Sequence, residues 1–82
     1  MKITVKFFSS LMEYLPTGSD DNFVELNVGD GFAVNDVLEK FNVPKSEIQT
    51  VMKNGAFLPE EERGNPLQDG DTITLWPSIQ GG

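Results

Sequence analysis

The sequence predicts an α+β fold, in which a mixed sheet of four to five strands packs one face against a single main helix. Two observations carry this prediction. Several short segments alternate apolar and polar residues, which is the period of a half-buried strand. Only residues 34–41 carry an apolar stripe with helical spacing, at positions i, i+3, i+4 and i+7. A single long helix must then cover one face of the sheet.

The N-terminal elements are a strand and a short helix. Residues 3–8 alternate with period two and predict the first strand. Ser10 and Glu13 then match a capping box, in which the Ser hydroxyl caps backbone donors and the Glu side chain returns the contact. Pro16 disfavours helical geometry at the residue before it, so this helix must be short. A polar loop over residues 16–22 follows.

The second strand and the main helix come next. Residues 24–28 alternate again and predict a strand. The helix over residues 34–41 has Asp36 in its first turn, where the helix dipole favours a negative charge. Asp36 and Lys40 lie one turn apart and can form an ion pair.

The C-terminal half predicts three more strands. Residues 48–53 read as a strand, and Asn54-Gly55 is a strong signal for a two-residue hairpin turn. Residues 56–58 are then the short return strand. Asp69-Gly70 marks a further turn before the last strand, at about 72–76. If this late strand joins the first, the order of elements is the β-grasp arrangement, which the pattern permits without proving.

The chain is expected to form one domain over residues 1–76, followed by a flexible tail over residues 77–82. Pro77 stiffens the root of this tail and blocks further strand pairing. Fully extended, the tail reaches roughly 20 Å from the domain.

Composition excludes several classes of function. The chain has no cysteine and no histidine, which removes disulfides, thiolate nucleophiles and the usual general base. No carboxylate spacing matches a calcium loop, so no metal site is expected. A net charge of −7 disfavours nucleic acid and anionic membranes. That charge serves either solubility or steering toward a basic protein partner.

The expected location is cytoplasmic. No apolar run approaches the length of a membrane span. The N-terminus enters a strand pattern directly and does not resemble a signal peptide. The absence of cysteine also fits a reducing compartment.

The last two residues, Gly81 and Gly82, are the only credible reactive feature of the chain. Two glycines alone are more simply explained as a frayed end or a cloning remnant. Joined to a stiff root, however, they have a chemical rationale. Glycines pass through a narrow channel because they carry no Cβ atom. The unhindered Gly82 carboxylate can be adenylated with ATP, and a sulfur nucleophile can then displace AMP to give a thiocarboxylate.

The chain resembles the molybdopterin-synthase small-subunit and thiamin sulfur-carrier (MoaD/ThiS) family, within the ubiquitin-like β-grasp superfamily. The resemblance covers nearly the whole chain and is carried by its opening strand, main helix, hairpin, Asp-Gly-Asp turn and tail. These motifs are Ile3-Thr4-Val5-Lys6-Phe7-Phe8, Val34-Asn35-Asp36-Val37-Leu38, Asn54-Gly55, Pro66-Leu67-Gln68-Asp69-Gly70-Asp71 and Trp76-Pro77-Ser78-Ile79-Gln80-Gly81-Gly82.

The resemblance implies that the protein is not itself an enzyme but a sulfur-carrier cosubstrate, with no bound cofactor. An E1-like enzyme that uses ATP and Mg would adenylate Gly82, and a sulfurtransferase would supply the sulfur. The thiocarboxylate would then enter the large subunit of molybdopterin synthase, or serve a tungsten-type cofactor. The alternatives are delivery to thiazole synthase for thiamin, ubiquitin-like conjugation to lysines, and an interaction module with an inert tail.

The residues that would bind partners are in and near the last strand. Phe8 and Trp76 fall on the side of their strands opposite the core set, so pairing of the two strands would make an exposed apolar patch beside the tail. The alternative is that Phe8 packs under the first helix. The family resemblance adds Phe57 or Leu58 to the patch. Within the tail, the expected contacts are Pro77, Ile79 and Gln80, and the family pattern has a small residue in place of Gln80.

Overall fold

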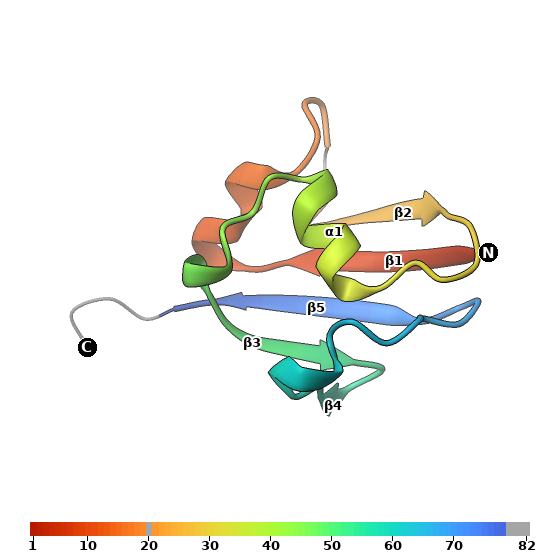
Figure 1. Ribbon diagram of the computed structural model, residues 1–82. Helices are drawn as coiled ribbons and strands as arrows, with labels where there is room; N and C mark the ends of the chain where they lie inside the picture. The colour runs from red at the N-terminus through yellow and green to blue at the C-terminus, as the bar shows by residue number, and fades with distance from the viewer. Residues whose placement is uncertain (20, 79–82) are drawn as a thin grey trace.

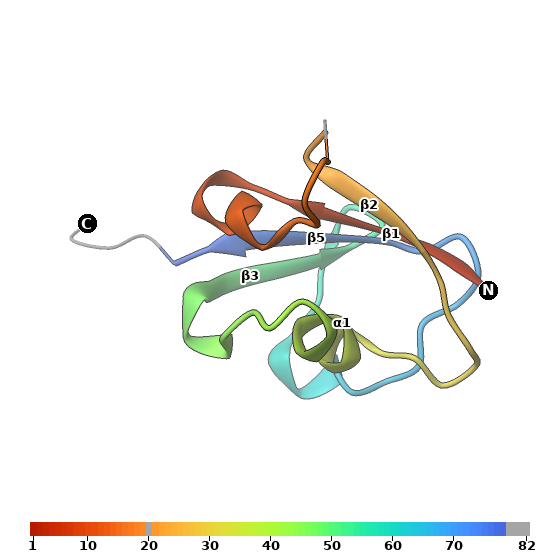
Figure 2. The ribbon, with the colours of Figure 1, turned by 90° about the horizontal axis from the view of Figure 1, so that it is seen from above.

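The sheet has the strand order β2-β1-β5-β3-β4 and carries one α-helix on one face (Figures 1 and 2). This computed structural model describes residues 1–19 and 21–78. The strands are β1 (Lys2–Phe7), β2 (Phe23–Asn27), β3 (Ile48–Lys53), β4 (Ala56–Phe57) and β5 (Thr72–Pro77). The α-helix is α1 (Val34–Lys40), and the short 3₁₀ helices are η1 (Ser9–Tyr14), η2 (Lys45–Glu47) and η3 (Glu60–Glu62).

The first and last strands lie side by side in the middle of the sheet. β1 and β5 run parallel, with Val5 opposite Ile73 and Phe7 opposite Leu75. All other pairings, β1 with β2, β3 with β5 and β3 with β4, are antiparallel. The mixed sheet and the single main helix confirm the predicted β-grasp arrangement. No helix in the described part of the chain is long and apolar enough to cross a membrane.

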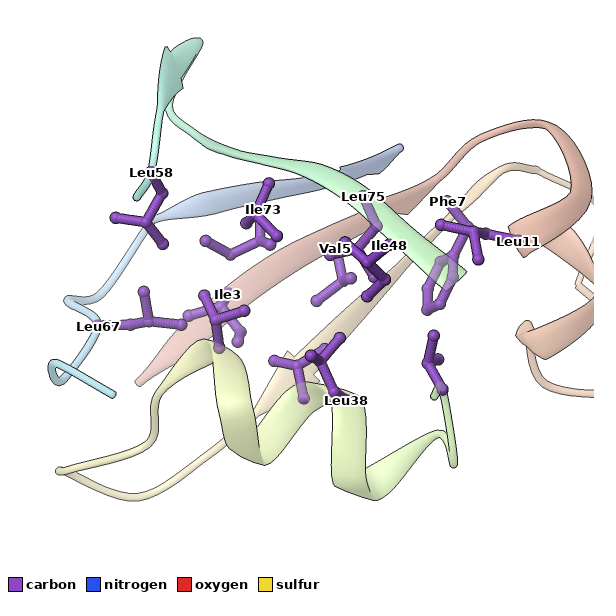
Figure 3. Packing of buried hydrophobic residues seen from close by; sticks show 14 residues of the cluster. Ile3, Val5, Phe7, Leu11, Leu38, Ile48, Leu58, Leu67, Ile73 and Leu75 are labelled. Carbon is purple, nitrogen blue, oxygen red and sulfur yellow. The ribbon is translucent and has the colours of Figure 1, made fainter. Parts of the chain in front are cut away.

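The core lies between the sheet and α1, where alternate residues of β1 and β5 meet the apolar stripe of the helix (Figure 3). Phe7 is fully buried, and its ring meets Phe41 edge to face at 5.3 Å. Burial of each such apolar side chain contributes about 1.5–3 kcal/mol. The predicted core phases of the first, second and last strands are confirmed, because their inward residues are buried or partly buried against this cluster.

The hairpin between β3 and β4 turns at Asn54-Gly55, as predicted. Both residues have positive φ, at 53° and 85°, which is the requirement of a type I′ turn. Asn54 also fixes the next turn along the sheet, since its side chain donates to Asp71 at 2.9 Å and accepts from the Thr72 N–H at 2.8 Å. The second carboxylate oxygen of Asp71 accepts from the Gln68 N–H at 2.8 Å.

Two local predictions are wrong, one cap at the first helix and one ion pair along α1. The first helix is a 3₁₀ helix that begins at Ser9, with Phe8 as its N-cap and no side-chain cap. The capping box of Ser10 and Glu13 does not form, because the chain enters η1 through a positive φ of 54° at Ser9 rather than through a capping Ser10.

At the start of α1, Asp36 lies in the first turn, as predicted. The Asp36 carboxylate accepts from the Ala33 N–H at 2.8 Å, so it satisfies a free backbone donor. Ala33 offers no side-chain oxygen in return. Asp36 forms no ion pair with Lys40, and across the described residues the ion pair is Lys2 with Glu25, at 3.9 Å on the surface.

Candidate functional site

Phe8 and Trp76 form a stacked aromatic pair on the face of the sheet that α1 leaves open. The parallel register that places Phe7 opposite Leu75 places the next residue of each segment side by side on the other face. The ring centroids are 4.2 Å apart and the ring planes differ by 13°. Trp76 keeps 38% of its surface exposed. The predicted pairing is confirmed, and its role in partner binding stays a prediction.

The open face carries a row of outward-facing side chains that crosses all five strands. The strand registers align Phe23, Lys6, Thr74, Met52 and Phe57 in this row. Its two ends are exposed aromatic rings, and Phe57 is 65% exposed. Together with the stacked pair, this row places apolar side chains on the open face on either side of Lys6 and Thr74, and exposed aromatic side chains of this kind are enriched at protein interfaces.

Phe57 and Leu58 take opposite sides of the sheet, so only one of them joins the open face. Phe57 is opposite Met52 on the exposed side, two strands away from Trp76. Leu58 is only 7% exposed and belongs to the hydrophobic core (Figure 3). The expectation that Leu58 extends the surface patch is wrong, because its backbone returns to β3 through a bond from the Leu58 N–H to the Val51 carbonyl.

The root of the predicted tail is tied to the domain. β5 includes Pro77, which lies opposite Ile48 in the register with β3. The Ser78 N–H donates to the Glu47 carbonyl at 2.9 Å, and the Ser78 hydroxyl donates to the Ser46 carbonyl at 3.2 Å. Sheet pairing therefore continues through Pro77, although the sequence predicted that this residue would stop it.

Tyr14 also contacts η2, the segment that anchors Ser78. Its hydroxyl donates to Glu47 Oε2 at 2.7 Å, which joins η1 to η2. The hydrogen bond to Glu47, followed by burial and by the negative charges of Glu47 and Glu13, raises the pKa of Tyr14 to about 12. The bond is therefore intact throughout the physiological pH range. It holds η2 where Ser78 is bound, at the same end of the molecule as the end of β5 (Figure 1).

A shallow groove of about 450 Å³ lies beside the Trp76 ring and is mainly apolar. Its floor includes a β-bulge, because the register of β3 with β5 shifts between Ile48 and Thr50. The bulge gives β3 one extra residue beside the end of β5, which leads to Ser78. The lining residues are Ser9, Gln49, Thr50, Trp76 and Pro77.

The reactive end of the tail lies beyond this geometry. The predicted contacts Ile79 and Gln80, and the predicted reactive residues Gly81 and Gly82, lie outside the described residues. Within the ranges that are described, no three carboxylates gather where they could hold a metal ion. The candidate site is therefore the open face together with the anchored root at Pro77 and Ser78.

Sequence reasoning missed several residues of this site. Phe23 and Met52 were not assigned to the open face, although Phe23 has the opposite phase to the inward residues of its strand. The anchoring contacts of Tyr14 and Glu47 were also missed. These two residues are 33 positions apart, and no local pattern signals that they meet.

Comparison with known proteins identifies the relatives of this chain. A family model described as Mut7-C ubiquitin matches residues 1–81. No curated protein matches the sequence.

Several solved structures share the fold. SAMP1 from Haloferax volcanii is 20% identical, with full coverage of both chains and a TM-score of 0.69. A putative molybdopterin converting factor, subunit 1, from Pyrococcus furiosus is 20% identical, with 95% of this chain and 98% of that chain covered and a TM-score of 0.67. One chain of a complex of subunits 1 and 2 of molybdopterin-converting factor from Helicobacter pylori is 20% identical, with full coverage of both chains and a TM-score of 0.61. These likenesses establish a ubiquitin-like β-grasp fold.

Proposed function

Since the chain belongs to the Mut7-C ubiquitin family, we propose that it is a sulfur carrier whose Gly82 carboxylate is converted to a thiocarboxylate. The sulfur would be used in the biosynthesis of molybdopterin or a related tungsten-type cofactor. The likeness of the fold to proteins described as molybdopterin-converting subunits supports this use of the sulfur.

The observation that carries the proposal is the way β5 leads to the terminal glycines. β5 is the middle strand of the sheet and is held on both edges, by β1 and by β3. Ser78 is then fixed by two hydrogen bonds to η2, four residues before Gly82. A rigid root followed by a short segment ending in Gly81-Gly82 can present a carboxylate to a partner's active site at a defined distance.

The chemistry requires two steps at the Gly82 carboxyl group. One carboxylate oxygen attacks the α-phosphorus of ATP, pyrophosphate leaves, and an acyl-adenylate forms. Hydrosulfide then attacks the carbonyl carbon and AMP leaves, which puts sulfur in place of one oxygen. If a protein persulfide attacks instead, the product is an acyl disulfide, and a second thiol of the partner must displace the thiocarboxylate by forming a protein disulfide. The chain has no histidine and no cysteine, so its partners must supply the acid–base groups and the sulfur-bearing thiol.

The open face is the surface that would hold such partners during these steps. The Phe8–Trp76 stack adjoins the root of the tail, so a partner that covers the stack also receives the segment after Ser78. The Helicobacter pylori complex joins a subunit of this fold to a second subunit, which supports a large-subunit partner for this chain. The activating enzyme and the sulfurtransferase are proposed from the chemistry alone.

Mass spectrometry of the intact protein tests the proposal. The full chain is incubated with ATP, Mg²⁺, hydrosulfide and a cognate adenylating enzyme. We expect replacement of one oxygen by sulfur at Gly82. Gly81→Val should abolish the reaction, because a branched side chain beside the reactive end blocks a narrow channel. Gly29→Ala is the matched control, since a Cβ at Gly29 meets nothing within 4 Å.

Two results would overturn the carrier proposal. If the mass of this chain is unchanged while the activating enzyme modifies its own carrier, the tail of this chain does not undergo the reaction. Covalent adducts between Gly82 and lysines would instead establish a protein modifier. The likeness of the fold to the small archaeal modifier protein 1 from Haloferax volcanii keeps this second function in view. The same mass spectrum separates the two functions.

A further inference from the structure

Arg63 is a buried cation without an anionic partner. Its side chain is 7% exposed, and its buried Nε atom has no acceptor in the part of the chain that the structure describes. The backbone of Arg63 is fully engaged, because its N–H donates to the Glu60 carbonyl and its carbonyl accepts from the Asn35 N–H. The ion pair among the described residues is Lys2 with Glu25, so no described carboxylate lies within 4.0 Å of the guanidinium.

A buried Nε–H without an acceptor is unfavourable, because burial removes its water and no described group replaces the lost hydrogen bond. Folded proteins rarely leave such a group without a partner. A ligand that supplies a hydrogen-bond acceptor would therefore bind favourably, because the free protein has already lost the hydration of this group. Arg63 is also the only arginine in the chain.

Arg63 lines a groove beside α1, on the side of the molecule opposite the open face of the sheet (Figure 2). The groove consists of two hollows of about 390 Å³ each, which share Asn35 and Lys45. One hollow is mixed, with about equal polar and apolar surface, and adds Glu60, Glu61 and Arg63. The other is mainly apolar, and its apolar surface comes from Leu38, Val43 and Pro44.

The chemistry of the groove selects one class of ligand. The planar guanidinium matches a carboxylate, with which it can form two parallel hydrogen bonds. Lys45 adds a second positive charge at the point where the hollows meet. Glu60 and Glu61 line the same hollow, and the whole chain has a net charge of −7. These negative charges oppose a phosphate dianion or a nucleic acid more strongly than a singly charged carboxylate, which the guanidinium and Lys45 can balance.

We propose that this groove binds a short segment of a partner protein in which an Asp or Glu side chain lies next to an apolar side chain. The carboxylate pairs with Arg63, and the apolar side chain fills the hollow over Leu38 and Val43. Because the groove and the open face lie on opposite sides of the sheet, a second protein can hold the chain while the face and the tail engage an enzyme.

Nuclear magnetic resonance gives a direct readout, since the sole arginine makes the Arg63 Nε–H signal unambiguous. The probe is the acetylated and amidated tripeptide Leu-Glu-Leu, added to the full chain labelled with nitrogen-15. We expect the Nε–H signal to shift and its exchange with water to slow, together with shifts at Asn35 and Lys45. The Leu-Gln-Leu peptide should bind about 10-fold more weakly or worse, because it cannot form a charge-assisted pair.

Two variants with the same loss of charge separate this site from general electrostatics. Arg63→Met keeps the length and apolar stem of the side chain and should abolish the difference between the Glu and Gln peptides. Lys6→Met removes one positive charge from the open face and should leave that difference unchanged. If Arg63→Met does not fold, the comparison of the two peptides on the unaltered protein still decides the question.

Several results would overturn the proposal. Equal binding of the Glu and Gln peptides, or shifts confined to the open face, would exclude a carboxylate site at Arg63. Tighter binding of a phosphoserine peptide than of the Glu peptide would exclude the charge match. If removal of residues 79–82 alone moves the Nε–H signal, the occupant is this chain's own terminal carboxylate rather than a partner segment. None of these results bears on sulfur transfer to Gly82, which is measured by mass.

Discussion

At the scale of single residues, Tyr14 and Glu47 form the contact that joins the first and second 3₁₀ helices. The hydrogen bond from the phenol to the carboxylate raises the pKa of Tyr14 to about 12, from an ordinary value of 10.0. A raised pKa means that the folded state favours the neutral phenol. This contribution to stability is complete below pH 10 and is lost as the pH rises through about 12.

Spectrophotometric titration tests this contact, because Tyr14 is the only tyrosine in the chain. We expect tyrosinate absorbance to develop with a midpoint near pH 12 in the unaltered protein. In Glu47→Gln the midpoint should fall toward 10.0, since the carboxylate is both the acceptor and a nearby negative charge. Glu13→Gln is the control and should move the midpoint less. A midpoint that Glu47→Gln leaves unchanged would contradict the assignment.

Asp71 is a buried carboxylate that holds two turns together. Its burial would by itself raise the pKa, but hydrogen bonds from Gln68 and Asn54 and the positive charge of Lys53 lower it below the ordinary 3.8. A lowered pKa contributes stability that is present above pH 3.8 and is lost as the pH falls through the folded value.

Chemical denaturation at two pH values tests the role of Asp71. Asp71→Asn should lower the free energy of unfolding at pH 6 by about 1–3 kcal/mol, because it removes a charge-assisted acceptor from a buried network. The difference from the unaltered protein should shrink at pH 3, where the native carboxylate begins to be protonated. A difference of the same size at both pH values would show that the charge of Asp71 contributes nothing.

At the scale of elements, periodicity in the sequence predicted those helices and strands whose formation depends on neighbouring residues. Residues 48–53 form β3 with the predicted bounds, and Val34–Lys40 forms the predicted helix. Period two in β1 and β5 was enough to place Phe8 beside Trp76. The family resemblance, not alternation, offered Leu58 for the patch, and β4 has only two residues, too few for alternation to show which side each one faces.

Other features could not be read from the sequence because distant segments create them. Ser78 is fixed by η2, which precedes it by some 30 residues, and a proline before Ser78 suggested an early end of pairing. Arg63 lies in a stretch without periodicity, so nothing local indicates that its side chain is buried. In each case tertiary contacts override the local signal.

The Phe8–Trp76 stack gives the prediction that belongs to β1 and β5. Phe8→Ala and Trp76→Ala should each weaken binding of the adenylating enzyme about 10-fold or more, as exposed aromatic anchors commonly do. Stability should fall by less than the ~3–5 kcal/mol typical of a buried aromatic residue. Met12→Ala, which removes a comparably exposed side chain from η1, is the control. Circular dichroism monitors the fold, because Trp76 is the only tryptophan and is absent from one variant, and global unfolding would identify the pair as core residues.

At the scale of the whole molecule, charge is far from balanced. The chain has thirteen acidic and six basic residues. The described ion pair between Lys2 and Glu25 is exposed and contributes little to stability. The fold is therefore held by its core and its hydrogen bonds, against the mutual repulsion of its carboxylates.

Salt should consequently stabilise the protein. We expect the free energy of unfolding in urea at pH 7 to rise as sodium chloride increases toward about 0.1 M, where the screening length falls to about 10 Å. The dependence on urea concentration should stay constant, because the exposed surface does not change. A fall in stability with salt would mean that attractive surface pairs outweigh the net charge of −7.

The central position of β5 ties completion of the fold to completion of synthesis. A ribosome makes β1 first and β5 last, yet β5 is the strand that joins the β2–β1 pair to the β3–β4 pair. A chain released before Thr72 has two unconnected hairpin fragments and an open core, which proteases remove readily. A copy that ends before Thr72 therefore cannot assemble the sheet that holds the root of the tail at Pro77 and Ser78.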